Sequence, residues 1–408
     1  MALIVLSFVI ILAVYVYISI REKSFINVYT PQLAIFLPAN YILVYIFNTY
    51  KSIDIEYSIG FVYVYVSYLL FFTISMIVYT FEYKIRAINL PSIQFLVHSD
   101  KLKVFSIFFF FLSIIIYLPI LYEYKEYLLH PREIYTHTRN GGGIYYFSSI
   151  FFMNIAFILS LFAFKKYFFI FLFFLILAFL HGSKGVIIWG GLVYLLFQVY
   201  FLNKKFSLIK SIAFIIIFVL MMFGVFLTTF TDASSVSDLI LKMASYSDYT
   251  RNAIKLIDNY DEYFSHYWNG QLLLEDNIYN KLPRILYEDK PRAFGSLRLA
   301  ASMYPEWFSK NVGDASFGLV GRPFADFGYL SIFYLIVLAT LQGFFLKICV
   351  QLFKRTQNIF YFIMLLFFSG LGLISLGLGY LFVTHLFIAF ALTYLITLTI
   401  TTSKEKAK

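Results

Sequence analysis

The sequence predicts an all-α polytopic membrane protein with about 11 transmembrane helices and one large polar loop on the outer side of the membrane. Of its 408 residues, 61% are hydrophobic and 13% are charged, and the mean hydropathy is +0.80. A soluble domain carries about a quarter charged residues. Apolar runs of about 20 residues, each long enough to cross the hydrocarbon, recur along most of the chain. The basic residues gather in alternate connections, as in an oriented bundle.

The predicted spans follow one another along most of the chain. Residues 2–20 lack a basic start and a small-residue cleavage site, so they are interpreted as the first span and not as a signal peptide. The second span, 26–50, contains Pro31, Pro38 and Asn40; without it, the later basic connections fall on the wrong side. The other predicted spans are 59–81, 104–122, 144–164, 167–182, 186–202, 211–230, 328–346, 358–376 and 379–401.

These spans divide the chain into three parts. Residues 1–229 form a transmembrane bundle with an outer loop at 123–143. Residues 230–327 form the large extracytoplasmic loop, in which 237–264 has the apolar spacing of an amphipathic helix lying on the membrane or on the bundle. Residues 328–408 complete the bundle and end in a basic tail.

The charge distribution orients the bundle. One set of connections holds 17 of the 32 Lys and Arg residues and four of the 22 acids, a balance of +13, and the other side balances at −3. The positive-inside rule therefore places the N-terminus outside and the C-terminus in the cytoplasm. It also explains the formal charge of +10 without a nucleic-acid partner. The single cysteine, Cys349, excludes an intrachain disulfide, and the sequence has no zinc-like Cys/His cluster.

The positive-inside rule disfavours cations on the outer face. The cations that do occur there are concentrated in the two long outer loops. Guanidinium groups bind phosphate in a bidentate manner and stay charged, so these clusters predict an anionic substrate at the outer surface. The alternative is that they pair with Glu133, Glu288, Asp289 or lipid headgroups and hold the loops together. The residues concerned are Arg132 and Arg139 in the first loop, and Arg284, Lys290, Arg292, Arg298 and Arg322 in the second.

The two loops share a spacing. Ten residues separate Arg132 from Gly143, and ten separate Arg284 from Gly295. Chance gives about half a match at any chosen spacing in this composition, so the occurrence in both long outer loops is what gives the pattern weight.

Four segments carry a resemblance to a known family: RNGGG at 139–143, LHGSKGVII at 180–188, LPRILYEDKPRAFGS at 282–296 and GRPFADFGYLSIF at 321–333. With the two arginine-bearing outer loops, they resemble the O-antigen polymerase (Wzy) family of bacteria, and the architecture is similar to GT-C glycosyltransferases. Members often have an acid shortly before the aromatic-Gly element. Here Gly321, Arg322 and Pro323 occupy that place, and Asp326 is the nearest acid.

The resemblance implies a metal-independent and cofactor-free glycosyltransferase of the bacterial inner membrane. It would transfer a growing glycan from undecaprenyl pyrophosphate to a sugar hydroxyl of an incoming lipid-linked repeat unit, producing the O-antigen of lipopolysaccharide, capsule or exopolysaccharide. A chain-length regulator, a flippase and membrane lipids are the implied partners. Pyrophosphate binding is assigned to Arg132, Arg139, Arg284, Arg292, Arg298, Lys290, Arg322 and Lys184. The catalytic base is sought among Asp314, Asp326 and His137.

Several alternatives stay open. Lys184 also fits a side chain that snorkels to the interface. An O-antigen ligase would share the arginine chemistry but transfer finished chains. A metal-dependent lipid-linked glycosyltransferase would need an acidic pair, which Asp54 and Glu56 offer in a very short loop. A flippase or other transporter would more usually bury ionisable residues within its spans.

Overall fold

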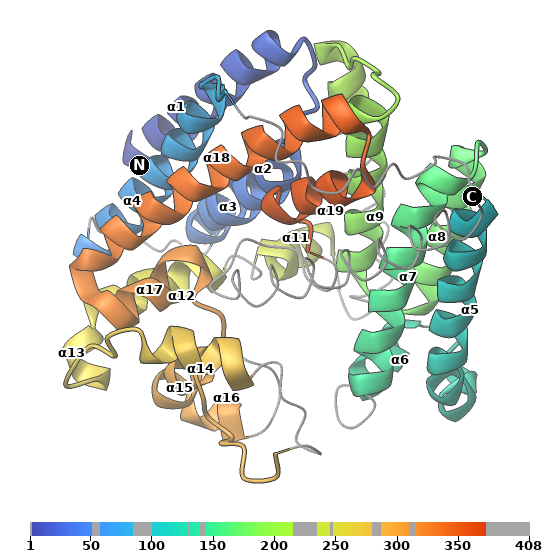
Figure 1. Cartoon of the computed structure of the whole chain (residues 1–408). Coiled ribbons are helices and arrows are strands. Elements are labelled where there is room, and N and C mark those ends of the chain that lie inside the picture. The colour runs from blue at the N-terminus through green and yellow to red at the C-terminus, as the bar shows by residue number, and fades with distance from the viewer. Residues whose placement is uncertain are drawn as a thin grey trace.

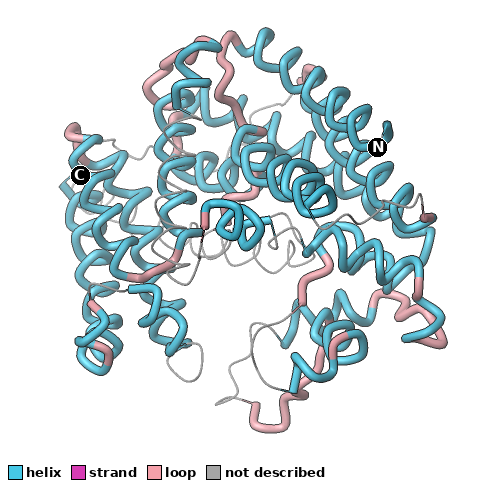
Figure 2. Tube along the Cα trace, turned by 180° about the vertical axis from the view of Figure 1, so that it is seen from behind, coloured by secondary structure: helices cyan, strands magenta, loops and turns pink. Residues whose placement is uncertain are grey.

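The chain is a helical protein in the computed structural model, which describes residues 2–50, 58–84, 100–128, 131–138, 143–214, 235–244, 248–279, 287–309 and 315–372. The regular elements in these ranges are helices, as predicted (Figure 1). Figure 2 shows the chain from behind, and no described segment carries the strand colour.

The N-terminal half contains most of the described helices that are long and apolar enough to cross a membrane. Its elements are α1 (Ala2–Glu22), α2 (Thr30–Leu37), η1 (Pro38–Ile42), α3 (Leu43–Tyr50), α4 (Ile59–Thr80), α5 (Asp100–Glu123), η2 (Lys125–Tyr127), α6 (Pro131–Thr138), α7 (Gly143–Ala163), α8 (Tyr167–Leu180) and α9 (Lys184–Tyr200).

The C-terminal half begins with short helices and ends with long ones. Its described elements are α11 (Val236–Ala244), α12 (Asp248–Asp258), α13 (Tyr260–Tyr263), α14 (Gln271–Tyr279), α15 (Ser296–Met303), α16 (Pro305–Ser309), α17 (Gly318–Phe327), η4 (Gly328–Leu330), α18 (Ser331–Thr356) and α19 (Ile359–Phe368).

Six described helical segments are long and apolar enough to cross a membrane: Ala2–Glu22, Thr30–Thr49, Ile59–Thr80, Asp100–Glu123, Gly143–Ala163 and Gly318–Thr356. Three shorter apolar helices, α8, α9 and α19, coincide with further predicted spans. The polytopic class is therefore confirmed, whereas the total of 11 and the GT-C likeness stay predictions. Most of the predicted span 211–230 and all of 379–401 lie outside the described residues.

The second predicted span is helical in spite of its prolines. Pro31 stands in the first turn of α2, where the missing N–H costs nothing. Pro38 cannot donate within the helix, and the chain passes through a π turn in which the Leu43 N–H donates to the Pro38 carbonyl oxygen. The Asn40 amide donates to the carbonyl of Phe36 at 2.9 Å. The span therefore continues through an irregular turn that contains a buried asparagine.

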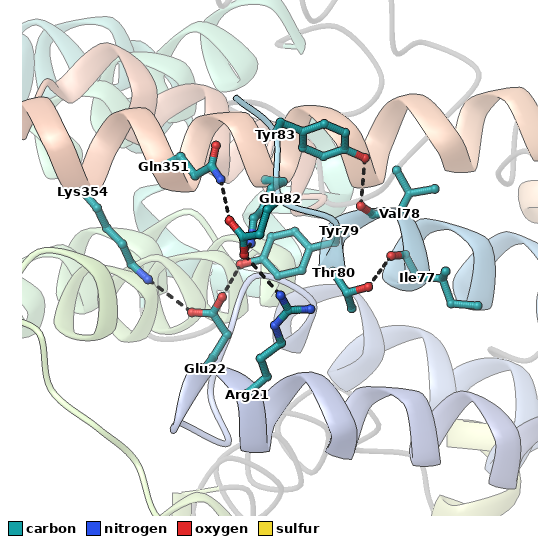
Figure 3. A network of polar contacts seen from close by, with 11 residues as sticks. Arg21, Glu22, Ile77, Val78, Tyr79, Thr80, Glu82, Tyr83, Gln351 and Lys354 are labelled. Atoms are coloured by element: carbon teal, nitrogen blue, oxygen red, sulfur yellow. Dashed lines mark hydrogen bonds and ion pairs between the residues drawn. The ribbon is translucent and has the colours of Figure 1, made fainter. Parts of the chain in front are cut away.

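One end of the bundle is fastened by a charged network (Figure 3). Glu82, just after α4, lies 3.2 Å from Arg21 of α1 and 3.0 Å from Lys347 of α18. Hydrogen bonding from Lys347, with the positive charge of Lys347 and Arg21, lowers the pKa of Glu82. Glu22 accepts a hydrogen bond from Tyr79 at 2.9 Å. The ends of three helices are thereby joined by residues that the sequence assigns to the cytoplasmic side.

Helix α18 is longer than the sequence predicts. The predicted span ends at residue 346, but the helix runs on to Thr356 and contains Lys347, Lys354 and Arg355. Two of these cations form ion pairs with acids at the ends of other helices: Lys347 with Glu82, and Lys354 with Glu22 at 3.3 Å. Neutralised cations of this kind are compatible with a helix that extends beyond the apolar core.

Helices α12 and α17 of the loop 230–327 pack against α4, and α17 also packs against α18, at the end opposite to the charged network (Figure 1). Asp258 of α12 accepts the Gly60 N–H at 2.7 Å, near the start of α4. Gly328, at the corner between α17 and α18, has a φ of +58° and lies against the Tyr267 ring, where a Cβ would clash. The aromatic-Gly element therefore needs its glycine to turn from the loop into the next helix.

Candidate functional site

The predicted site residues fall into groups that the structure describes to different extents. Arg139, Arg284 and Asp314 lie outside the described residues, as do Asp54 and Glu56. Arg132 is the second residue of α6, and its side chain is likewise outside the described part. The structure therefore does not test whether the leading arginines of the two outer loops come together.

In the first outer loop, His137 lies near the end of α6 and is exposed. Its ring stacks on Tyr124, with centroids 5.5 Å apart and planes 13° apart, and it also contacts Tyr127 at 5.4 Å. Tyr124 directly follows α5 and Tyr127 is the last residue of η2, so the two tyrosines hold the imidazole at the start of this loop.

In the second loop, Arg298 is held by an acid. Its Nε and one terminal nitrogen each donate to Glu275 of α14 at 2.8 Å, and its guanidinium lies 5.3 Å from the Trp268 ring centroid. Burial raises the pKa of Glu275, but the hydrogen bonds from Arg298, Gly295 and Gln271 outweigh it, so the net shift is downward. The partner of Arg298 is therefore not one of the acids that the sequence suggested.

The glycine of the second Arg-to-Gly pattern has a clear steric role. Gly295 has a φ of +49°, and a Cβ there would clash with Asp276. Its N–H donates to Glu275 at 2.7 Å, and the Ser296 N–H donates to Asp276 at 3.2 Å. The adjacent acids Glu275 and Asp276 of α14 therefore accept hydrogen bonds from the backbone at the start of α15. Gly143 meets only the Phe147 ring, at 4.0 Å, so the two patterns differ in what their glycines do.

Lys290 and Arg292 lie on the segment before α15. Arg292 is exposed and donates to the carbonyls of Phe308 and Ser309 at 3.0 and 3.2 Å, at the end of α16. The Lys290 ammonium lies 4.8 Å from the centroid of Phe294. Together with Arg298, these cations are borne by one compact group of helices, α14 to α16.

Asp326 caps a helix. Its carboxylate is buried and accepts the N–H groups of Gly270, Leu272 and Leu273 at 3.0 to 3.1 Å, at the start of α14. Burial raises the pKa of Asp326 to about 6, and the helix N–H groups that it accepts oppose this shift only in part. In this structure Asp326 positions α14, and a role in proton transfer stays a prediction.

Two further candidates lie within helices and are partly exposed. Arg322 is half-buried in the middle of α17, one residue before Pro323. Lys184 is the first residue of α9 and is also half-buried. It follows the His181 hairpin, in which the His181 Nε2 lies 2.8 Å from the Ser149 hydroxyl.

Sequence reasoning missed a polar cluster on α12. The Arg251 guanidinium lies 3.7 Å from the centroid of Phe47, and Lys255 lies 5.0 Å from that of Tyr304. Burial raises the pKa of Asp248 and lowers that of Arg251. Arg251 and Lys255 are four residues apart and therefore share a helix face, and this spacing was the available signal. The cluster adds two cations to the loop where it meets the bundle.

Among the described residues, no group of three or more His, Cys, Asp or Glu side chains is arranged to hold a metal ion. The features that the structure does show are helices long and apolar enough to cross a bilayer, a charged network at one end of the bundle and a helical loop that bears several cations at the other. They define a polytopic helical membrane protein with a large polar insertion.

Two curated proteins named O-antigen polymerase, from Salmonella typhimurium and Salmonella typhi, are each 36% identical to the chain over 387 residues. The match covers 92% of this chain and 91% of each relative. The chain therefore belongs to the O-antigen polymerase family. No family model matches it, and no solved structure matches it either.

Proposed function

We propose that the chain polymerises oligosaccharide repeat units carried on undecaprenyl pyrophosphate, as a glycosyltransferase at the outer face of the bacterial inner membrane. The match to two O-antigen polymerases carries this proposal. A match over 92% of the chain necessarily includes most of residues 230–327 as well as the spans. The likeness therefore extends to the loop that bears the outer cations, and not only to a pattern of apolar helices.

The proposed reaction makes one bond and breaks one. The hydroxyl oxygen of the acceptor sugar attacks the anomeric carbon of the growing glycan, and the bond from that carbon to pyrophosphate breaks. The hydroxyl proton passes to a base, and undecaprenyl pyrophosphate leaves with the bonding electrons. Negative charge grows on the leaving group, and well-placed donors are worth about 3 kcal/mol each when they meet such charge.

The outer arginines suit the leaving group. Arg132, Arg139 and Arg284 are the proposed principal contacts, because they lie in the two long outer loops and their charge is independent of accessible pH. Arg292 and Lys290 lie on one short segment, and this supports their acting together. Arg298 shares its guanidinium with Glu275, so its remaining N–H groups are the ones proposed for phosphate. Arg322 and Lys184 are proposed as outlying contacts.

The base is proposed to come from the same loops. Asp326 has the raised pKa that suits a general base, but both of its oxygens already accept helix N–H groups. His137 is exposed and held by stacking on Tyr124, which fits a group that exchanges protons with a substrate. Asp314 stays a candidate by its place in the loop.

The orientation is part of the proposal. The network of Arg21, Glu82 and Lys347 joins three connections that the sequence assigns to the cytoplasm, so these connections lie at the same end of the bundle. Helix α12 of the loop 230–327 contacts α4 at its other end. This separation supports a cytoplasmic basic end and an outer reaction site.

The decisive test is replacement of Arg132 or Arg284 by Ala in cells that lack the native gene. Removing one transition-state donor costs about 2 to 4 kcal/mol, or roughly 30-fold to 1,000-fold in rate. The variants should make surface glycan with a single repeat unit in place of a ladder of lengths. Lysine should rescue poorly, because a point charge cannot reproduce a bidentate fork. Arg355→Ala, at the end of α18, is the matched control.

The glycan pattern also separates the alternatives. A failed ligase would leave long polymer on its lipid carrier, and a failed flippase would leave single repeats facing the cytoplasm. Normal ladders from both alanine variants at wild-type protein levels would exclude these arginines from the reaction. Normal ladders after deletion of the whole gene would refute the polymerase itself.

A further inference from the structure

A cavity of about 610 Å³ lies between α5, α7 and α8. These three helices stand side by side in Figure 1. The cavity is near the first turn of α5 and the connection from α7 to α8, whereas α6 follows the other end of α5. It is therefore well separated along these helices from the first outer loop. Its volume falls within the range of about 300 to 1,000 Å³ that is usual for small-ligand pockets.

One side of this cavity is basic. It is lined by Lys103 of α5 and by Lys165 and Lys166, which are exposed in the connection from α7 to α8. Asp100 lies 2.8 Å from Lys103 and is 94% exposed. No acid lines the cavity itself, so the lysines leave a local excess of positive charge. An anion is the complementary occupant for this end.

The rest of the wall is aromatic and aliphatic. Phe110 of α5 and Phe173 of α8 meet edge to face, with centroids 5.4 Å apart. Ile107 and Phe169 also line the cavity and are 45% and 67% exposed, so the wall continues onto the apolar outer surface of these helices. A hydrocarbon chain lying there would pass directly into the surrounding lipid.

Two buried serine hydroxyls form a polar contact in the wall of the cavity. The hydroxyl of Ser106 on α5 and that of Ser160 on α7 are 2.7 Å apart, and Ser160 also donates to the carbonyl of Ala156 at 2.6 Å. Both serines are buried and bonded to each other, so they join the helices at the back of the cavity. The interior is otherwise suited to an apolar group.

We propose that this cavity binds one anionic phospholipid, with its phosphate among Lys103, Lys165 and Lys166 and an acyl chain along Phe110 and Phe173. A soluble anion would leave the apolar wall uncovered, and a lipid without net charge would not balance the positive charge of Lys165 and Lys166. Basic pockets between membrane helices bind anionic headgroups in this way. The proposal does not depend on the polymerase reaction or on its arginines.

The test uses purified full-length protein in detergent and native mass spectrometry. The probes are phosphatidylglycerol and phosphatidylcholine with identical acyl chains. We expect one phosphatidylglycerol to be retained and phosphatidylcholine to be lost. The triple variant Lys103→Gln, Lys165→Gln and Lys166→Gln should retain phosphatidylglycerol roughly tenfold less well, because each lysine adds attraction for the headgroup.

Two further variants separate the effect of the lysine charges on lipid binding from the effect of the cavity's shape. Lys205→Gln with Lys210→Gln removes exposed cations elsewhere and should leave binding unchanged. Ile107→Trp fills the cavity from its exposed wall, keeps every charge and should also reduce binding. Its partial exposure makes it tolerable if the triple variant fails to fold. Equal retention of both lipids, wild-type retention by the lysine and tryptophan variants, or displacement of the lipid by glycerol phosphate would overturn the proposal.

Discussion

Asp326 offers the sharpest test, because a helix cap and a catalytic base respond differently to the same substitution. In Asp326→Asn, the remaining carbonyl oxygen can still accept from Gly270 and Leu272, which both bond to Oδ1. The new amide then faces the Leu273 N–H, which bonds to Oδ2 in the wild type. One bond of three is lost, and we expect a cost of about 1 kcal/mol in the free energy of unfolding.

Asp326→Ala removes all three acceptors. A lost cap costs about 0.5 to 2 kcal/mol, and each buried N–H left unsatisfied costs about 1 to 3 kcal/mol. Since these terms overlap, we expect about 3 kcal/mol in total. Thermal unfolding of the purified protein in detergent should therefore rank the wild type first, the Asn variant next and the Ala variant last.

Activity decides between the two roles. If Asp326 only caps α14, the Asn variant should extend lipid-linked repeats within a few fold of the wild-type rate. If it is the base, its removal should cost about 100-fold to 10,000-fold. An Asn variant with near wild-type stability that adds no repeat units would refute the capping argument and identify Asp326 as the base.

Three other outcomes are expected. In a Cys349→Ser background, an impermeant thiol reagent should label a cysteine at Lys255 in intact cells but not one at Lys205, and labelling of the latter would reverse the orientation. Purified protein should extend lipid-linked repeats in excess chelator; loss of activity restored by magnesium or manganese would favour a metal-dependent transferase. The lowered pKa of Glu275 stabilises the fold at pH values above its ordinary pKa of 4.5, and this contribution is lost as the pH falls through the lowered value. Acid unfolding should therefore be less steep for Glu275→Gln, and identical curves would exclude the ion pair with Arg298 as a source of stability.

The sequence was sufficient to predict the position of helices that depend only on the hydropathy of nearby residues. An apolar run predicts a membrane helix wherever it occurs, and α7, predicted at 144–164, is observed at Gly143–Ala163. The predicted span 328–346 gives the apolar part of α18, whereas the helix runs on to Thr356, where Lys347 and Lys354 pair with acids from other helices. Hydropathy alone contains no information about such partners.

The contacts of the site were less predictable for the same reason. Arg298 pairs with Glu275, 23 residues away, and Asp326 caps a helix that begins 55 residues earlier. Each residue was noticed for its chemistry, but its partner depends on how the helices of the loop pack. Arg251 was passed over because an amphipathic pattern shows which face is polar and not which aromatic ring that face meets.

The buried asparagine of the second span has a consequence for how the protein is made. Asn40 accepts a hydrogen bond from the Thr250 hydroxyl at 2.6 Å, and 210 residues separate the two. At a synthesis rate of about 5 to 20 residues per second, Thr250 is synthesised roughly 10 to 40 s after Asn40. The helix with a π turn is therefore made before the side-chain oxygen of Asn40 has this donor, although its amide can already bond to the Phe36 carbonyl. Biogenesis of the bundle is complete only when α12 has docked, so the loop is also a late step in assembling the membrane domain.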